Sequence, residues 1–214
     1  MRFYRLPCGP LSVNTYLVGA DNTKDCVVID PGEAAPVLSV LEKEDLHCTH
    51  ILITHGHFDH IGGIRGIQEK FGALIYIHEL DAPMLSSNRV SLASLMGETR
   101  PSVNADVLLQ DGDLLDAAGL HFRILHTPGH SPGGVCYVLD TEKIIFCGDT
   151  LFFESAGRTD FPGCSQKELY HSIVDQLYTL EGDYTLYCGH DQSTTLDHER
   201  TYNPLTHYGA KFNW

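Results

Sequence analysis

The sequence predicts an α/β protein in which two β-sheets pack together and helices cover their outer faces. Two observations support this fold class. Short apolar runs with the length of buried strands fall into two groups along the chain, and each group is followed by segments with helical spacing of apolar residues. The chain has 214 residues, 43% of them hydrophobic, so it can bury a sizeable core as a single domain over residues 1–214.

The first group of elements ends near residue 77. Cys8-Gly9-Pro10 is a turn between the first two strands, and Asp30-Pro31-Gly32 ends the third. The third and fourth strands are short apolar runs, typical of strands that are buried on both faces. Strands are expected at residues 3–6, 13–18, 26–29, 50–54 and 73–77, and helices at residues 33–44 and 61–71.

The second group follows the least periodic part of the chain. Residues 78–105 are expected to hold a short helix near 81–85 and then a mobile loop. Ser165 is the expected N-cap of the main helix of this half. The apolar pair 108–109 and a turn at residues 111–113 come first. Strands are then expected around residues 120–125, 135–139, 143–146 and 184–187, and a helix at residues 165–180.

The acidic composition excludes two classes of partner. The chain carries 28 Asp and Glu residues against 14 Lys and Arg residues, for a formal net charge of −14. A surface of this charge repels nucleic acid and anionic membranes. The expected partner is a small molecule, and the chain itself is expected to be a monomer or a small homo-oligomer.

Cysteine usage indicates a reducing compartment. The seven cysteines are odd in number, form no CxxC pair, and mostly lie in apolar runs such as Asp25-Cys26-Val27-Val28. The amino-terminal segment has no uninterrupted apolar run of the kind found in a signal peptide, and no segment approaches the length needed to span a bilayer. A cytoplasmic location is expected.

The segment His55-Gly56-His57-Phe58-Asp59-His60 concentrates metal-binding groups after a buried strand. Gathering and desolvating unpaired imidazoles and a carboxylate is costly, whereas a metal ion makes the same gathering favourable. A turn over Gly56 can present His55 and His57 to one point. Asp59 and His60 then face another point as the chain enters a helix, so this loop can serve two metals.

Three more coordinating residues follow predicted strands in the same way. His130, Asp149 and His190 each come directly after a glycine, which lets the backbone turn sharply and approach closely. One Gly-His pair after a strand is weak evidence, because such a pair is more often structural than a ligand. Four such loops in one small domain predict a metal centre.

This set of motifs resembles the metallo-β-lactamase superfamily. The resemblance covers nearly the whole chain and implies a four-layer αβ/βα sandwich, with two mixed β-sheets flanked by helices and a metal site along one edge. It implies that Asp30, in Val28-Ile29-Asp30-Pro31-Gly32, orients a ligand imidazole. It further implies that one metal is bound by His55, His57 and His130 and a second by Asp59, His60 and His190, with Asp149 bridging the pair.

These ligands imply a hydrolytic mechanism. A water held between two divalent ions loses its proton near neutral pH and attacks a carbonyl as hydroxide. Asp59 and Asp149 are the expected catalytic residues, acting with the metal-bound hydroxide. A ligand set of nitrogen and oxygen accepts zinc, iron or manganese; two divalent ions are expected, with zinc as the first expectation.

Two further segments indicate the branch of the superfamily. Gly157-Arg158-Thr159-Asp160-Phe161 and the stretch 199–204 resemble glyoxalase II-like hydrolases and persulfide dioxygenases. The length resembles the short bacterial type II glyoxalase-like proteins, which lack the carboxy-terminal extension that holds glutathione. Hydrolysis of acyl thioesters, as by a hydroxyacylglutathione hydrolase, is therefore expected. Arg158 is the candidate for gripping an acidic substrate, and the alternative is an arginine that stabilises its loop through backbone carbonyls.

Other functions remain open at the level of sequence. His55, His130 and Asp149 form a two-His, one-carboxylate set that suits a single Fe(II), as in a persulfide dioxygenase. Another superfamily hydrolase, such as a lactonase or a weak β-lactamase, is a further alternative. A metal-binding module without catalysis is disfavoured, because no ligand position of the motif is substituted.

Overall fold

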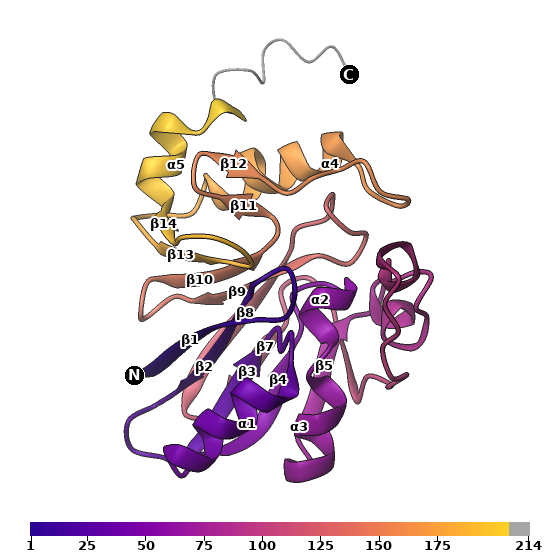
Figure 1. Ribbon diagram of the computed structural model, residues 1–214. Coiled ribbons are helices and arrows are strands. Elements are labelled where there is room, and N and C mark those ends of the chain that lie inside the picture. The colour runs from indigo at the N-terminus through magenta and orange to yellow at the C-terminus, as the bar shows by residue number, and fades with distance from the viewer. Residues whose placement is uncertain (206–214) are drawn as a thin grey trace.

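The computed structural model describes residues 1–205 and places two β-sheets face to face with helices on both outer sides (Figure 1). Helices α1 (Ala34–Lys43) and α3 (Ile64–Phe71) cover one sheet. Helices α4 (Gln166–His171) and α5 (Leu196–Tyr202) cover the other. The order helix, sheet, sheet, helix confirms the predicted four-layer sandwich. Residues 206–214 of the predicted single domain lie outside the described residues.

The amino-terminal sheet, sheet A, has six strands in the order β1-β2-β3-β4-β5-β6. The first three strands pair antiparallel, and β3 to β6 pair in parallel. The strands are β1 (Arg2–Cys8), β2 (Val13–Gly19), β3 (Asp25–Ile29), β4 (His47–Leu52), β5 (Leu74–His78) and β6 (Val107–Leu109). Parallel strands end at the same edge, so the loops after β3 and β4 are neighbours.

The carboxy-terminal sheet, sheet B, has the order β14-β13-β10-β9-β8-β7. Only β10 and β13 pair in parallel. Its strands are β7 (Leu114–Ala117), β8 (Leu120–His126), β9 (Val135–Leu139), β10 (Ile144–Gly148), β13 (Thr185–Cys188) and β14 (Thr194–Thr195). A separate hairpin of β11 (Leu151–Phe152) and β12 (Ser155–Ala156) follows β10.

Alternation along the central strands creates three apolar interiors. On β3, Val27 and Ile29 face the interior between the sheets, whereas Cys26 and Val28 face α1 and α3. The same period of two on β9 sends Tyr137 between the sheets and Val138 toward α4. Because both faces of these strands are covered, their residues are almost all apolar. This continuous apolar pattern is why the strands could be predicted from the sequence.

The remaining helices are short, and the last of them follows α4 directly and packs on sheet B. They are α2 (Phe58–Ile61), the 3-10 helices η1 (Ala82–Ser86) and η2 (Ala93–Met96), and the π-helix η3 (Ser172–Leu177). The predicted helix at 61–71 begins only at Ile64, after Gly62-Gly63. Ser165 caps α4 as expected by accepting a hydrogen bond from Glu168 N, but the predicted helix 165–180 divides into α4 and η3.

Several elements differ from the sequence prediction. The expected mobile loop after residue 85 contains η2, held by backbone hydrogen bonds such as Glu98 N to Ala93 O at 2.9 Å. Strands β7, β11, β12 and β14 and helix α5 were not predicted. The strands are short or exposed, and α5 buries only Leu196 and Glu199, so periodicity does not reveal them. None of the described helices is both long and apolar enough to cross a membrane.

Candidate metal centre

Four strand-end loops bring the seven predicted ligands together. His55, His57 and His130 form one group, and Asp59, His60 and His190 form another, with the ligand atoms of each group within 4.8 Å of one another. The first loop follows β4, and the other loops follow β8, β10 and β13. Residues up to 135 positions apart in sequence, His55 and His190, therefore share one site because their strands end at one edge of the two sheets.

Asp149 lies between the two groups. Its Oδ2 atom lies 3.5 Å from His130 Nε2 and 3.6 Å from His190 Nε2. Its Oδ1 atom lies 3.4 Å from His60 Nε2. The side chain therefore reaches both groups, which is the geometry expected of a bridging carboxylate.

Three buried atoms of the cluster have no hydrogen-bond partner among the described residues: His55 Nε2, His60 Nε2 and Asp149 Oδ1. Leaving buried polar atoms unpaired is costly, and native proteins seldom do so. His57 Nδ1 also lies 2.9 Å from His130 Nε2, so two ring nitrogens turn toward one point. These nitrogen and oxygen donors fit divalent cations, which would satisfy all of them.

The far nitrogens of three imidazoles are held by the protein. His60 Nδ1 donates to Asp30 Oδ2 at 3.0 Å, and His130 Nδ1 donates to the carbonyl of Arg158 at 2.8 Å. His190 Nδ1 donates to the carbonyl of Leu11 at 3.1 Å. Each bond leaves the Nε2 lone pair directed into the cluster, so the rings are fixed in the tautomer that binds a metal.

Asp30 organises a second imidazole through Thr54. Its carboxylate accepts from Thr54 N at 2.7 Å and from Thr54 Oγ1 at 2.6 Å. Thr54 Oγ1 in turn accepts from His55 Nδ1 at 3.2 Å. Asp30 itself has φ of +49°, in the left-handed region that aspartate adopts more readily than most residues other than glycine. The expected contact between Asp30 and a cluster imidazole is therefore present, and it extends to His55.

Burial and crowding perturb the ionisation of the cluster. Burial, followed by the neighbouring His130, lowers the pKa of His57 to about 3. At His60 burial acts to lower the pKa, but Asp59, Asp149 and Asp30 outweigh it and raise the pKa to about 10. The three carboxylates therefore favour a positive charge at His60 Nε2. A bound cation would supply this charge in place of a proton.

The family model of the metallo-beta-lactamase superfamily matches residues 8–190, a span that contains all seven cluster residues. The chain belongs to the metallo-beta-lactamase superfamily. Among curated relatives, hydroxyacylglutathione hydrolase GloC of Haemophilus influenzae is 34% identical over 86% of this chain and 89% of its own. The probable metallo-hydrolase YqgX of Bacillus subtilis is 32% identical over 96% of this chain and 97% of its own.

Solved structures support the same assignment. BLEG-1 B3 metallo-beta-lactamase superposes with a TM-score of 0.91 at 35% identity, covering 95% of this chain and 98% of that one. TTHA1623, solved in a di-iron-bound form, gives 0.83 at 35% identity over 94% and 98%. ETHE1 from Myxococcus xanthus gives 0.79 at 29% identity over 100% and 92%. The glyoxalase II-like branch predicted from sequence is consistent with these relatives.

We expect Asp30→Asn to weaken metal binding by about 10–100-fold, because losing a partner that orients a ligand typically costs this much. The amide would turn an NH₂ group toward Thr54 or His60, both of which are donors. Competition titration against a chromophoric chelator measures the change. Asp25→Asn, at the other end of β3, is the control and should leave affinity unchanged. Wild-type affinity in Asp30→Asn would contradict the orienting role.

Asp81 is a buried carboxylate that sequence reasoning missed. It accepts hydrogen bonds from Gly56 N at 3.0 Å, Ser131 Oγ at 2.7 Å and Gly133 N at 2.6 Å. These bonds join the loop of His55 to the loop of His130. Burial raises the pKa of the Asp81 carboxyl above its usual value. No motif marks this residue, since its role depends on two loops that lie far from it in sequence.

Replacing Asp81 by asparagine should lower the free energy of unfolding by ~3 kcal/mol, because the amide leaves buried donors without acceptors. Denaturant unfolding of the metal-free protein measures the loss. Asp116→Asn is the matched control, since Asp116 is 81% exposed and, within residues 1–205, its carboxylate pairs only with an exposed histidine. Its effect should stay within about 0.5 kcal/mol. A loss in Asp81→Asn no larger than in this control would show that the bridge between loops does not stabilise the fold.

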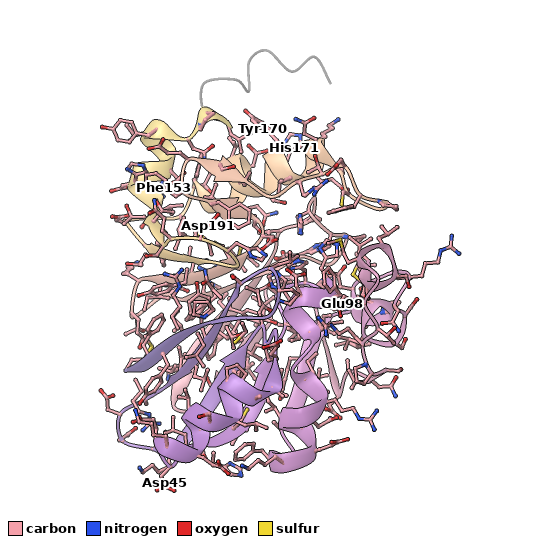
Figure 2. The ribbon with its side chains drawn as sticks, in the orientation of Figure 1. Asp45, Glu98, Phe153, Tyr170, His171 and Asp191 are labelled. Carbon is pink, nitrogen blue, oxygen red and sulfur yellow. The ribbon has the colours of Figure 1, made fainter. Side chains whose placement is uncertain are left out.

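A cavity of about 440 Å³ opens above the cluster. His57, Asp59, His130, Asp149 and His190 form its floor. Its walls come from both halves of the chain. In Figure 2, Asp191, the residue after His190, lies in the carboxy-terminal half, and Glu98, just beyond η2, lies in the amino-terminal half.

Arg158 lines this cavity, but its charge is already paired. Its Nε and one terminal nitrogen donate to the two carboxylate oxygens of Asp160, each at 2.7 Å, and its guanidinium lies 4.3 Å from the centre of the Phe161 ring. The alternative predicted for Arg158 was a side chain that bonds backbone carbonyls of its loop. In the structure the side chain bonds Asp160 instead. The carbonyl of Arg158 fixes His130, so Arg158 contributes to the centre through its backbone.

Proposed function

We propose that this protein is a metal-dependent hydrolase of acyl thioesters, resembling hydroxyacylglutathione hydrolases. The observation that carries the proposal is the pair of ligand groups joined by Asp149, with three buried atoms that a metal would satisfy. The membership in a metallo-hydrolase superfamily supports hydrolysis, and the 34% identity to GloC supports the thioester as the substrate class.

His55, His57 and His130 would hold one ion, and Asp59, His60 and His190 the other, with Asp149 shared. When bound, such ions acidify water and polarise a carbonyl. Zinc is the first expectation, and iron and manganese are compatible with the same donors; the relative TTHA1623 has been solved with two irons. Asp30, Thr54 and the carbonyls of Arg158 and Leu11 keep the imidazoles in the orientation that this binding needs.

The chain then positions the reactants in the cavity. The thioester carbonyl lies over the cluster, and Asp59 and Asp149 orient the attacking water from the cavity floor by accepting its hydrogen bonds. Water adds its oxygen to the acyl carbon, the carbon–sulfur bond breaks, and the sulfur takes up a proton. The products are one carboxylic acid and one thiol, with no oxidant or reductant consumed.

The test compares substrates on one protein sample loaded separately with zinc, iron(II) or manganese. We expect turnover of S-lactoylglutathione or of a simpler lactoyl thioester with at least one metal, and none after chelation. Oxygen uptake with glutathione persulfide, together with no thioester turnover under any metal, would replace this proposal with persulfide dioxygenase. The likeness to ETHE1 makes that comparison necessary. Lactone and β-lactam substrates in the same assay test the other hydrolase activities.

We also propose that the protein acts on small molecules in the cytoplasm, without nucleic-acid or membrane partners, as a monomer or small homo-oligomer. The net charge of −14 and the seven free cysteines support this setting. Light scattering after size exclusion measures the oligomeric state, and a large assembly would contradict that part.

A further inference from the structure

The cavity over the cluster has apolar walls on several sides. Leu92, Leu95 and Met96, which we call the η2 wall, lie on one side. Leu95 is 68% exposed and Met96 57% exposed. Single exposed apolar side chains are common on protein surfaces, but two neighbours at the mouth of a cavity that contains the reactive groups indicate a binding surface.

The η2 wall is fixed in place rather than loosely attached. Leu92 has φ of +68°, a costly backbone conformation for a residue with a branched side chain. Its side chain is buried and packs with Phe58 and Ala93. Phe58 N, next to the ligand His57, donates to the carbonyl of Ser91 at 2.9 Å. The wall is thereby anchored to the ligand loop, and Leu95 and Met96 stay beside the site.

Aromatic rings border both ligand groups. The Phe161 ring lies edge-on to His57 with 5.9 Å between the ring centres. The Phe152 ring lies edge-on to His190 with 6.3 Å between the centres. Both phenylalanines line the cavity, as does Leu11, which is 44% exposed. Apolar surface therefore lies next to each ligand group.

The cavity lining has few polar side chains that could bind the charged groups of a substrate. Outside the ligands, the polar residues that line the cavity are Ser155 and Arg158. Both carboxylate oxygens of Asp160 already bond the Arg158 guanidinium. A peptide thiol with several charges would need fixed donors that these two residues do not supply.

We infer that the cavity selects thioesters that carry an uncharged, apolar substituent next to the reacting carbonyl–sulfur group, such as an aliphatic chain that packs on the η2 wall. This inference rests on the proposed thioester hydrolysis and narrows its substrate class. The apolar substituent can come from the acyl side or from the thiol side. The chemistry that recognises it, burial against Leu95, Met96 and the bordering phenylalanines, is the same in both cases.

The experiment uses two uncharged substrate series with the metal-loaded enzyme. One lengthens the acyl group from acetyl to hexanoyl on N-acetylcysteamine, and the other lengthens an alkanethiol that carries a constant acetyl group. We expect kcat/KM to rise about fourfold for each added methylene in one of the two series, the effect of burying one such group. The series that rises identifies which side of the thioester contacts the η2 wall.

The double variant Leu95→Ser/Met96→Ser should reduce this rise to less than about twofold per methylene. Both side chains are exposed, so the variant should keep the wild-type melting temperature. Leu114→Ser is the matched control, because Leu114 is 79% exposed on β7 and does not line the cavity. It should leave the chain-length dependence unchanged.

A binding measurement separates failure of this inference from failure of the proposed function. Unreactive thioether analogues, S-ethyl and S-hexyl N-acetylcysteamine, are titrated calorimetrically into the enzyme. Tighter binding of the hexyl analogue, lost in the double variant, supports the inference even if no thioester is hydrolysed. Thioester turnover with flat chain-length series, or S-lactoylglutathione preferred over every apolar thioester, overturns the inference and leaves thioester hydrolysis standing.

Discussion

Replacing Asp149 with alanine is expected to remove both metal ions and to lower hydrolysis by at least ~10³-fold. Its carboxylate contacts both ligand groups, at 3.4 Å from His60 Nε2 and 3.5 Å from His130 Nε2. A catalytic metal, when bound, would typically stabilise the transition state by several kcal/mol, and about 1.4 kcal/mol corresponds to a tenfold change in rate. Elemental analysis and a thioester assay on the same sample measure both effects.

Two further variants test whether the loss of both ions is specific to Asp149. His190→Ala should mainly lose one ion, because His190 lies in only one of the two groups that flank Asp149. Glu181→Ala, which removes an exposed carboxylate outside the cluster, should keep both ions and full activity. If Asp149→Ala retains two ions and wild-type turnover, the shared-carboxylate arrangement is wrong. Two ions lost from both Asp149→Ala and His190→Ala would show that the groups bind cooperatively and not as separate sites.

Gly189→Ala should be nearly as damaging, although it removes no ligand. A Cβ atom at Gly189 would lie 2.2 Å from Asp149 Oδ1 and 2.8 Å from His60 Cε1. Real side chains do not approach this closely, so the shared carboxylate or the backbone of β13 must move. Displacing catalytic groups by about 1 Å typically costs ~10²-fold in rate. We therefore expect activity to fall by at least that factor and metal affinity to fall with it.

Gly72→Ala is the matched control for that variant. Gly72 has φ of +65° at the end of α3, and a Cβ there would meet nothing within 4 Å. Alanine should cost ~1 kcal/mol of stability through backbone strain and leave the metal centre intact. Wild-type metal content and turnover in Gly189→Ala would mean that the loop after β13 adjusts freely. The close approach would then have no functional role.

The seven residues of the cluster could be predicted from the sequence because their signals are local. The group at His55 to His60 is dense in ligands, and His130, Asp149 and His190 each follow a glycine after an apolar strand. The central strands are buried on both faces, so their sequences are continuous apolar runs. Such runs can be recognised as strands without knowing which sheet packs against them. The fold class, and the seven residues that the structure brings together, could therefore be predicted from the residue pattern alone.

The partners of these residues were decided only by the tertiary structure. Asp81 was not predicted because its three donors, Gly56, Ser131 and Gly133, belong to loops up to 52 positions away. The ion pair of Arg158 with Asp160 is local, but only the structure shows that this pair lies against Phe161 and that Arg158 lines the cavity.

The η2 wall also could not be predicted from the sequence. Residues 86–105 lack periodicity because their apolar side chains serve different surfaces: Leu92 is buried against Phe58 and Ala93 at the cavity wall, while Leu95 and Met96 are exposed at the cavity. Periodicity reports one continuous buried face, and this segment has none. The sequence alone thus determined which residues collect at the sheet edge. How the cluster atoms are oriented, and which side chains line the cavity, depended on packing between loops that come together only on folding.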